Sequence, residues 1–124
     1  MELIKIRGTE DTPNVILDAQ KGIFEFSGRS LPENVMSFYA PVFQWIEKYI
    51  QSPNPRTVVV FKLDYFNTAS SKIILDILIY FEHLSKEGHD VLVKWFYQED
   101  DEDMAEAGEE YFEIVEISYE MHSY

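Results

Sequence analysis

Cysteine is missing from this 124-residue chain. Its absence excludes disulfide bonds, thiolate zinc sites and cysteine nucleophiles, and it is compatible with a reducing compartment. The first residues, Met-Glu-Leu-Ile-Lys-Ile, do not form the basic region and apolar stretch of a secretion signal, and no segment is as long and apolar as a membrane span. We therefore expect a cytoplasmic protein that does not contact a membrane.

Positive charge is also scarce. Ten Lys and Arg residues stand against 23 Asp and Glu residues, which gives a formal net charge of −13 at pH 7. Binding to nucleic acid or to anionic lipid normally requires a basic face, so we expect neither as a partner. A charge of this size keeps a protein soluble, and it suits a protein partner that carries a basic patch.

Glycine and histidine are too sparse and too scattered for the common cofactor motifs. None of the five glycines belongs to a Gly-x-Gly-x-x-Gly or Gly-Lys-Ser/Thr cluster, which argues against nucleotide binding. A calcium-loop frame that starts at Asp101, within the acidic segment 99–110, has Glu106 and Phe112 where the loop needs Gly and Glu. The three histidines lack the spacing of metal ligands. We expect no metal, no cofactor and no catalytic residues.

The chain does contain enough apolar residues, 46%, to build a core, and its length suits a single domain over residues 1–124. The spacing of these residues predicts an α/β fold, a mixed β-sheet with packed helices. On the first helix, Trp45 lies off the main apolar stripe, and we expect it to be exposed for a partner. The expected order is strands at 3–6, 15–17 and 23–26, a loop at 28–31, a helix to residue 50, a central strand at 58–63, a helix at about 71–87, a strand at 91–97, a short exposed helix within 99–110 and an edge strand at 114–117.

The segment 58–84 carries the most informative pattern. A buried strand, a turn rich in hydroxyl groups and an apolar helix follow one another, so four polar residues lie at or just before a helix N-terminus: Asn67, Thr68, Ser70 and Ser71. One interpretation is ordinary capping by Ser70 or Ser71. A second is a phosphorylation site, because free N–H groups near Ser70 and Ser71 and the positive end of the helix dipole would hold a phosphate. A third is a small hydrolase that uses the Ser70/Ser71 turn, although the glycines of a nucleophile elbow are absent.

The turn from Asn67 to Ser71 resembles the phosphorylation segment of STAS-type anti-sigma-factor antagonists, in which an Asp-Ser-Ser-Gly-like turn carries the regulatory hydroxyl. Asn67 stands where Asp is usual, and Ser70 stands where Gly is usual. Nearly the whole chain resembles the SiaC family in the order of five short motifs: Gly8-Thr9-Glu10-Asp11-Thr12-Pro13, Ser30-Leu31-Pro32-Glu33-Asn34, Trp45-Ile46-Glu47-Lys48-Tyr49, the run from Leu63 to Ser71, and Trp95-Phe96-Tyr97.

This resemblance implies a STAS-like fold and a phosphoprotein without catalytic activity of its own. It implies that a partner Ser/Thr protein kinase modifies Thr68 and that a PP2C-type phosphatase restores it, with Asn67, Ser70 and Ser71 around the site. Ala69 cannot be phosphorylated, which leaves Thr68 as the nearest candidate. The unmodified form is expected to bind and activate a diguanylate cyclase, which would link partner switching to cyclic-di-GMP signalling and biofilm regulation.

Overall fold

The computed structural model describes residues 2–124, which form six strands and three helices in alternating order after an N-terminal run of strands. None of the helices in this part of the chain is long and apolar enough to span a bilayer. The elements are β1 (Ile4–Ile6), β2 (Pro13–Asp18), β3 (Ile23–Ser30), α1 (Val35–Tyr49), β4 (Arg56–Phe66), α2 (Thr68–Lys86), β5 (Asp90–Tyr97), α3 (Glu102–Ile114) and β6 (Ser118–Ser123).

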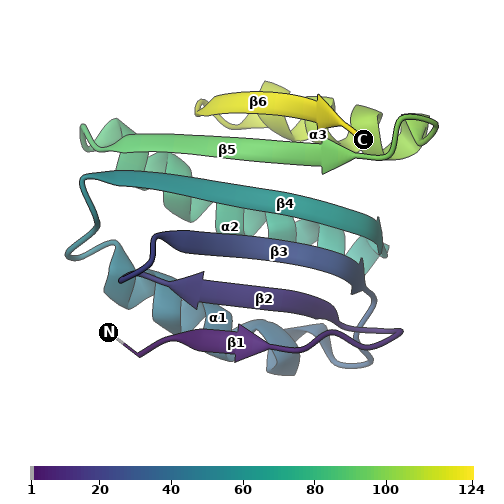
Figure 1. The fold of residues 1–124 in the computed structure, drawn as a ribbon, viewed down its shortest axis with the longest axis horizontal. Helices are drawn as coiled ribbons and strands as arrows, with labels where there is room; N and C mark the ends of the chain where they lie inside the picture. Colours follow the sequence, from purple (N-terminus) through teal and green to yellow (C-terminus); the bar gives the residue numbers. More distant parts are fainter. Residues whose placement is uncertain (1) are drawn as a thin grey trace.

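The strands pair in the order β1-β2-β3-β4-β5-β6, which is also their order along the chain (Figure 1). β2 is antiparallel to both of its neighbours, β1 and β3, whereas β3, β4, β5 and β6 are parallel. Each parallel connection needs a crossover, and α1, α2 and α3 supply the three crossovers in turn. The predicted mixed sheet with β4 inside it and helices packed against it is therefore confirmed.

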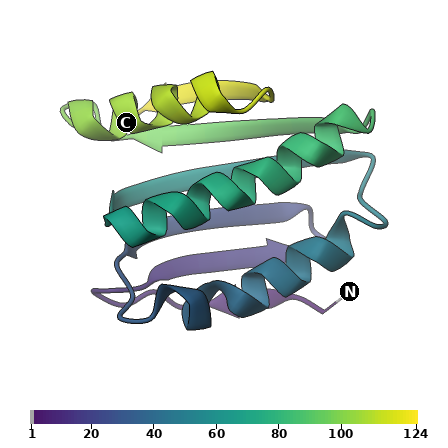
Figure 2. The ribbon, with the colours of Figure 1, turned by 180° about the vertical axis from the view of Figure 1, so that it is seen from behind.

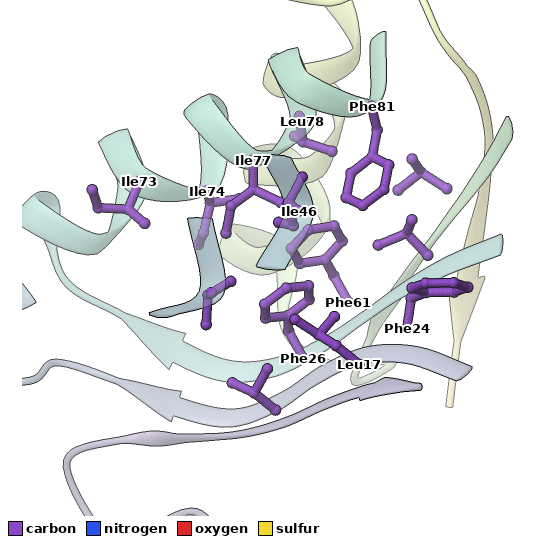
Figure 3. Packing of buried hydrophobic residues seen from close by; sticks show 14 of the residues in the cluster. Leu17, Phe24, Phe26, Ile46, Phe61, Ile73, Ile74, Ile77, Leu78 and Phe81 are labelled. Atoms are coloured by element: carbon purple, nitrogen blue, oxygen red, sulfur yellow. The ribbon is translucent and has the colours of Figure 1, made fainter. Parts of the chain in front are cut away.

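All three helices cover the same face of the sheet (Figure 2). In β4, alternate side chains such as Val59 and Phe61 are buried under the helices, whereas Lys62, which lies on the opposite face, is exposed. The rings of Phe26 and Phe61 stack across neighbouring strands with centroids 5.0 Å apart. Figure 3 shows the core between the layers, where side chains from the strands face those of α1 and α2: Leu17, Phe24, Phe26, Ile46, Phe61, Ile74, Ile77 and Phe81.

Trp45 is buried, and its predicted exposure is wrong. Its side chain is only 6% exposed, its ring stacks on Tyr49 with centroids 5.3 Å apart, and its indole N–H donates to the backbone carbonyl of Glu2 at 2.6 Å. The reason is that β1 and β2 extend the sheet beneath α1, so the buried face of this helix is wider than its apolar stripe alone indicates.

Other predictions also differ from the structure. Residues 28–30 continue β3 instead of starting a loop, because they pair with the end of β4 around a bulge. The last strand is 118–123 and not 114–117, since α3 continues to Ile114. α3 is exposed on one face only: Gly108 packs against Trp95, so closely that a Cβ at Gly108 would lie 2.5 Å from the indole Cδ1.

Candidate functional site

The turn between β4 and α2 holds the four residues that the sequence singles out. Asn67 is the N-cap of α2: its backbone is extended, and its side-chain Oδ1 accepts the N–H of Ser70 at 2.9 Å. Its own carbonyl accepts the N–H of Ser71 at 2.9 Å. Capping by Ser70 or Ser71 is therefore wrong, because the helix begins at Thr68 and the amide of Asn67 reaches the third helical residue first.

Ser70 points into the protein and belongs to a buried chain of hydroxyl groups. Its side chain is fully buried, and its Oγ accepts a hydrogen bond from Ser30 Oγ at 2.9 Å. The hydroxyls of Ser30 and Tyr39 lie 2.6 Å apart, and burial raises the pKa of Tyr39, which keeps its hydroxyl neutral. Since the Ser30 carbonyl also accepts the Asn67 N–H at 3.1 Å, β3, α1 and the start of α2 are tied together at this point.

Ser71 connects the start of α2 to α3. Its hydroxyl donates to the backbone carbonyl of Thr68 at 2.6 Å, and its own carbonyl accepts the hydroxyl of Tyr111 at 2.7 Å. Burial is the main cause that raises the pKa of Tyr111, so this donor stays protonated well above neutral pH. Both the hydroxyl and the backbone carbonyl of Ser71 are therefore hydrogen-bonded, and the bond from Tyr111 connects α3 to the turn.

Thr68 differs from its neighbours because its side chain is exposed at the first position of α2. Within residues 2–124, the backbone N–H groups of Thr68 and Ala69 have no hydrogen-bond acceptor, whereas those of Asn67, Ser70 and Ser71 are paired. We expected the free N–H groups near Ser70 and Ser71, whereas they belong to the two residues just before these, Thr68 and Ala69. Two free N–H groups at the positive end of a 19-residue helix favour an anionic group on Thr68.

An acidic hollow lies at the end of β4, the strand that leads into this turn. A hollow of about 420 Å³ between the end of β4 and the start of α3 is lined by Asp64, Tyr65, Phe66, Asp101, Asp103, Met104 and Ala107. Arg29, at the end of the neighbouring strand, lies over the ring of Tyr65 at 5.4 Å and donates through Nε to the carbonyl of Glu10. A phosphate on Thr68 would add negative charge to a surface that already carries three carboxylates.

The same turn does not form a hydrolytic triad in the structure. Ser70 is buried, and the hydroxyl of Ser71 donates to a backbone carbonyl and not to a base. His83 and His122 contact Glu87 and Glu120, and across residues 2–124 no histidine forms a hydrogen bond with a serine. The described residues also contain no cluster of three or more His, Cys, Asp or Glu side chains that could hold a metal ion.

Sequence reasoning missed Ser30 and Tyr39, whose hydroxyl groups form the buried hydrogen-bond chain that ends at Ser70. Ser30 lies 40 residues from Ser70 along the chain, and only the parallel pairing of β3 with β4 brings the two together. Tyr39 falls on the buried stripe of α1, where an apolar pattern hides its hydroxyl. The signal that could have identified these two residues is chemical. A buried hydroxyl group requires a hydrogen-bond partner, and the expected fold offered few such partners.

Comparisons with known proteins agree with one another. A structure of SiaC of Pseudomonas aeruginosa is 28% identical and matches with a TM-score of 0.90, covering 100% of both chains. A structure of the diguanylate cyclase SiaD in complex with its activator SiaC, from the same organism, matches with a TM-score of 0.92 at 30% identity, covering 98% of this chain and 99% of the matched chain.

The sequence comparisons give the same result. An uncharacterised protein of Pseudomonas aeruginosa (strain UCBPP-PA14) is 30% identical over 100% of this chain and 98% of its own length. The family model described as SiaC family regulatory phosphoprotein matches residues 6–124, which include the whole turn and every residue that supports it. The chain therefore belongs to the SiaC family of regulatory phosphoproteins.

Proposed function

We propose that this chain is a non-catalytic phospho-switch. A partner Ser/Thr kinase phosphorylates Thr68, a PP2C-type phosphatase removes the phosphate, and the unmodified form binds and activates a diguanylate cyclase in the cytoplasm. The observation that carries the proposal is the exposed Thr68 hydroxyl at the first position of α2, beside two N–H groups that have no acceptor within residues 2–124. The three neighbouring polar side chains are already engaged in holding the turn.

The cyclase partner is supported by the solved complex of SiaD with its activator SiaC, whose matched chain has the fold of this chain over nearly its whole length. An activator without catalytic activity of its own acts by binding its partner. The net charge of −13 on this chain suits a partner with basic groups. Activation of a diguanylate cyclase would raise the concentration of cyclic-di-GMP. Through this signal the chain would regulate biofilm formation, as the resemblance to the family implies.

Phosphorylation would act on the partner surface and leave the fold intact. A phosphate adds about −1.5 to −2 charges and three acceptor oxygens. The N–H groups of Thr68 and Ala69 and the dipole of α2 favour this charge locally. A bound partner instead meets a strongly hydrated anion beside Asp64, Asp101 and Asp103. A loss of about 3 kcal/mol at the interface weakens affinity by roughly a hundredfold.

The test combines modification and binding. The chain is incubated with ATP and a candidate partner Ser/Thr kinase from its own organism, and the modified residue is identified by mass spectrometry. Binding and activation are then measured with a diguanylate cyclase, SiaD of Pseudomonas aeruginosa. We expect one phosphate on Thr68, none on Thr68→Ala, and loss of cyclase binding on phosphorylation.

Ser37→Ala is the matched control, because Ser37 is an exposed hydroxyl residue in the first turn of α1, a helix that is likewise capped by an asparagine, Asn34. This variant should be phosphorylated and bind like the wild type. A phosphate found elsewhere, or a phosphorylated chain that binds the cyclase as tightly as the unmodified one, would refute the proposal at Thr68.

A further inference from the structure

One face of the sheet carries no helix. Figure 1 shows the molecule from this side, with the strands in front and the three helices behind them, and within residues 2–124 no helix or strand covers it. We call it the open face. It is formed by the side chains that alternate with the buried ones along each strand, such as Val58 and Val60 in β4 and Leu92 and Lys94 in β5.

The sequence of β4 is typical of a strand that is covered on both faces. The run from Val58 to Phe61 is continuously apolar, and strands of parallel sheets have such runs because both of their faces are normally buried. In the structure, alternate residues of the run are buried under the helices, whereas Val58 and Val60 are partly exposed. Leu92 on β5 and Ile23 on β3, which is 38% exposed, extend this apolar area to the neighbouring strands. The middle of the open face therefore lacks the second layer that its sequence predicts.

Charged side chains of alternating sign cross the open face in one row. The strand registers place the row in this order from β1 to β6: Lys5, Ile16, Glu25, Val60, Lys94 and Glu120. Its two lysines and two glutamates sum to zero charge, although the whole chain carries −13. Among residues 2–124, no ion pair joins Lys5, Glu25 or Lys94 to an opposite charge. A neutral face allows a second acidic copy to approach without the repulsion that the rest of the surface exerts.

The order of the charges makes the open face complementary to itself. Two packed sheets lie about 10 Å apart with their strands nearly aligned. A two-fold axis parallel to the strands, between β3 and β4, places β1 of one copy over β6 of the other. Lys5 then faces the partner's Glu120 at both ends of the row, and Lys94 lies one strand away from the partner's Glu25. A two-fold axis along the row would instead place every charge over its own copy.

We propose that the open face binds the open face of a second copy in this orientation, which forms a symmetric dimer. In the middle of the interface, Ile23 lies over the partner's Val58. Six strands span about 24 Å and the apolar and charged rows roughly 15–20 Å, so each copy contributes on the order of 400–500 Å². This area is small for a specific interface, so the dimer is weak and reversible. The helices of both copies face outward, and the dimer presents two Thr68 turns.

Charge reversal tests the dimer with the chain alone. Sedimentation velocity of the wild type should show reversible dimerisation between about 5 and about 500 µM, the range expected for a small interface. Lys5→Glu and Glu120→Lys each place like charges opposite one another at both ends of the row, so each should weaken dimerisation by at least about tenfold. The matched controls Lys48→Glu and Glu113→Lys change the net charge equally at exposed residues of α1 and α3, and they should dimerise like the wild type.

An equimolar mixture of Lys5→Glu and Glu120→Lys gives the second measurement. In a mixed dimer both ends of the row again join opposite charges, so the mixture should dimerise within about threefold of the wild type although each variant alone does not. A wild type that stays monomeric over the whole range refutes the proposal. A dimer that the reversals weaken no more than the controls, or a mixture that does not recover, refutes it as well, because the copies then pair by another surface or in another orientation. None of these results depends on Thr68 or on the cyclase.

Discussion

Removing the Tyr39 hydroxyl should destabilise the protein although the ring stays in place. In Tyr39→Phe, the buried Ser30 hydroxyl loses a partner at 2.6 Å. A buried polar group without its partner costs about 1–3 kcal/mol, a substantial part of the roughly 5–15 kcal/mol by which such domains are stable. We therefore expect the free energy of unfolding to fall by about 1–2 kcal/mol, measured by urea denaturation with an unchanged m-value.

The hydroxyl chain also predicts how substitutions combine. Ser70→Ala removes the other partner of Ser30, so Tyr39→Phe and Ser70→Ala together should cost less or more than their sum by at least about 0.5 kcal/mol. Tyr80→Phe is the matched control, because it removes a tyrosine hydroxyl that bonds Glu47 at the exposed surface, and its effect should stay within about 0.5 kcal/mol. Strict additivity, or a Tyr39→Phe variant as stable as the control, would refute the description of a coupled buried network.

Four further outcomes follow from the geometry. Thr68→Glu should lose the cyclase with a melting temperature within about 2 °C of the wild type, whereas Asn67→Ala should lose about 1 kcal/mol of stability by removing the helix cap, both measurable by thermal denaturation. Gly108→Ala should destabilise by about 1–3 kcal/mol, because its new Cβ meets the Trp95 ring. Burial raises the folded-state pKa of Tyr111, so its contribution to stability is complete below pH ~10 and declines as the pH rises further, because the tyrosine ionises first in the unfolded chain. Tyr111→Phe should therefore flatten the decline of the free energy of unfolding between about pH 9 and 11, measured by urea denaturation at each pH. A decline as steep as that of the wild type would contradict this expectation.

The local part of this fold could be predicted from the sequence because its signals are local. The apolar run at 58–63 and the hydroxyl-rich turn after it predict a strand, a break and a helix start, and Thr68 lies at the start of that helix, which begins three residues before the predicted position of about 71. The residue that caps the helix is harder to predict. Asn67, Ser70 and Ser71 all belong to residue types that cap helices, and which of them does so depends on the exact residue at which the helix begins.

The remaining features depend on contacts between distant segments. Trp45 is buried because Glu2 and β1 lie beneath α1, and nothing in the α1 sequence reports how wide the sheet is. Ser30 meets Ser70 only after β3 and β4 pair around a bulge. The hollow between α1 and α2 likewise requires the two helices to lie side by side, so Met36 and Ile79, which line it, gave no signal on their own. Side-chain periodicity identifies the elements, and strand pairing decides which elements meet.

The agreement between strand order in the sheet and strand order in the chain has a consequence for how the protein folds. Every strand pairs with its immediate predecessor, so the sheet can grow by addition at one edge as the chain leaves the ribosome. Ser30, Tyr39 and Asn67 are all synthesised before or next to Thr68, and they can position its turn while α3 is still unmade. Tyr111 is synthesised after them, so its hydrogen bond to Ser71 can form only once α3 has been made.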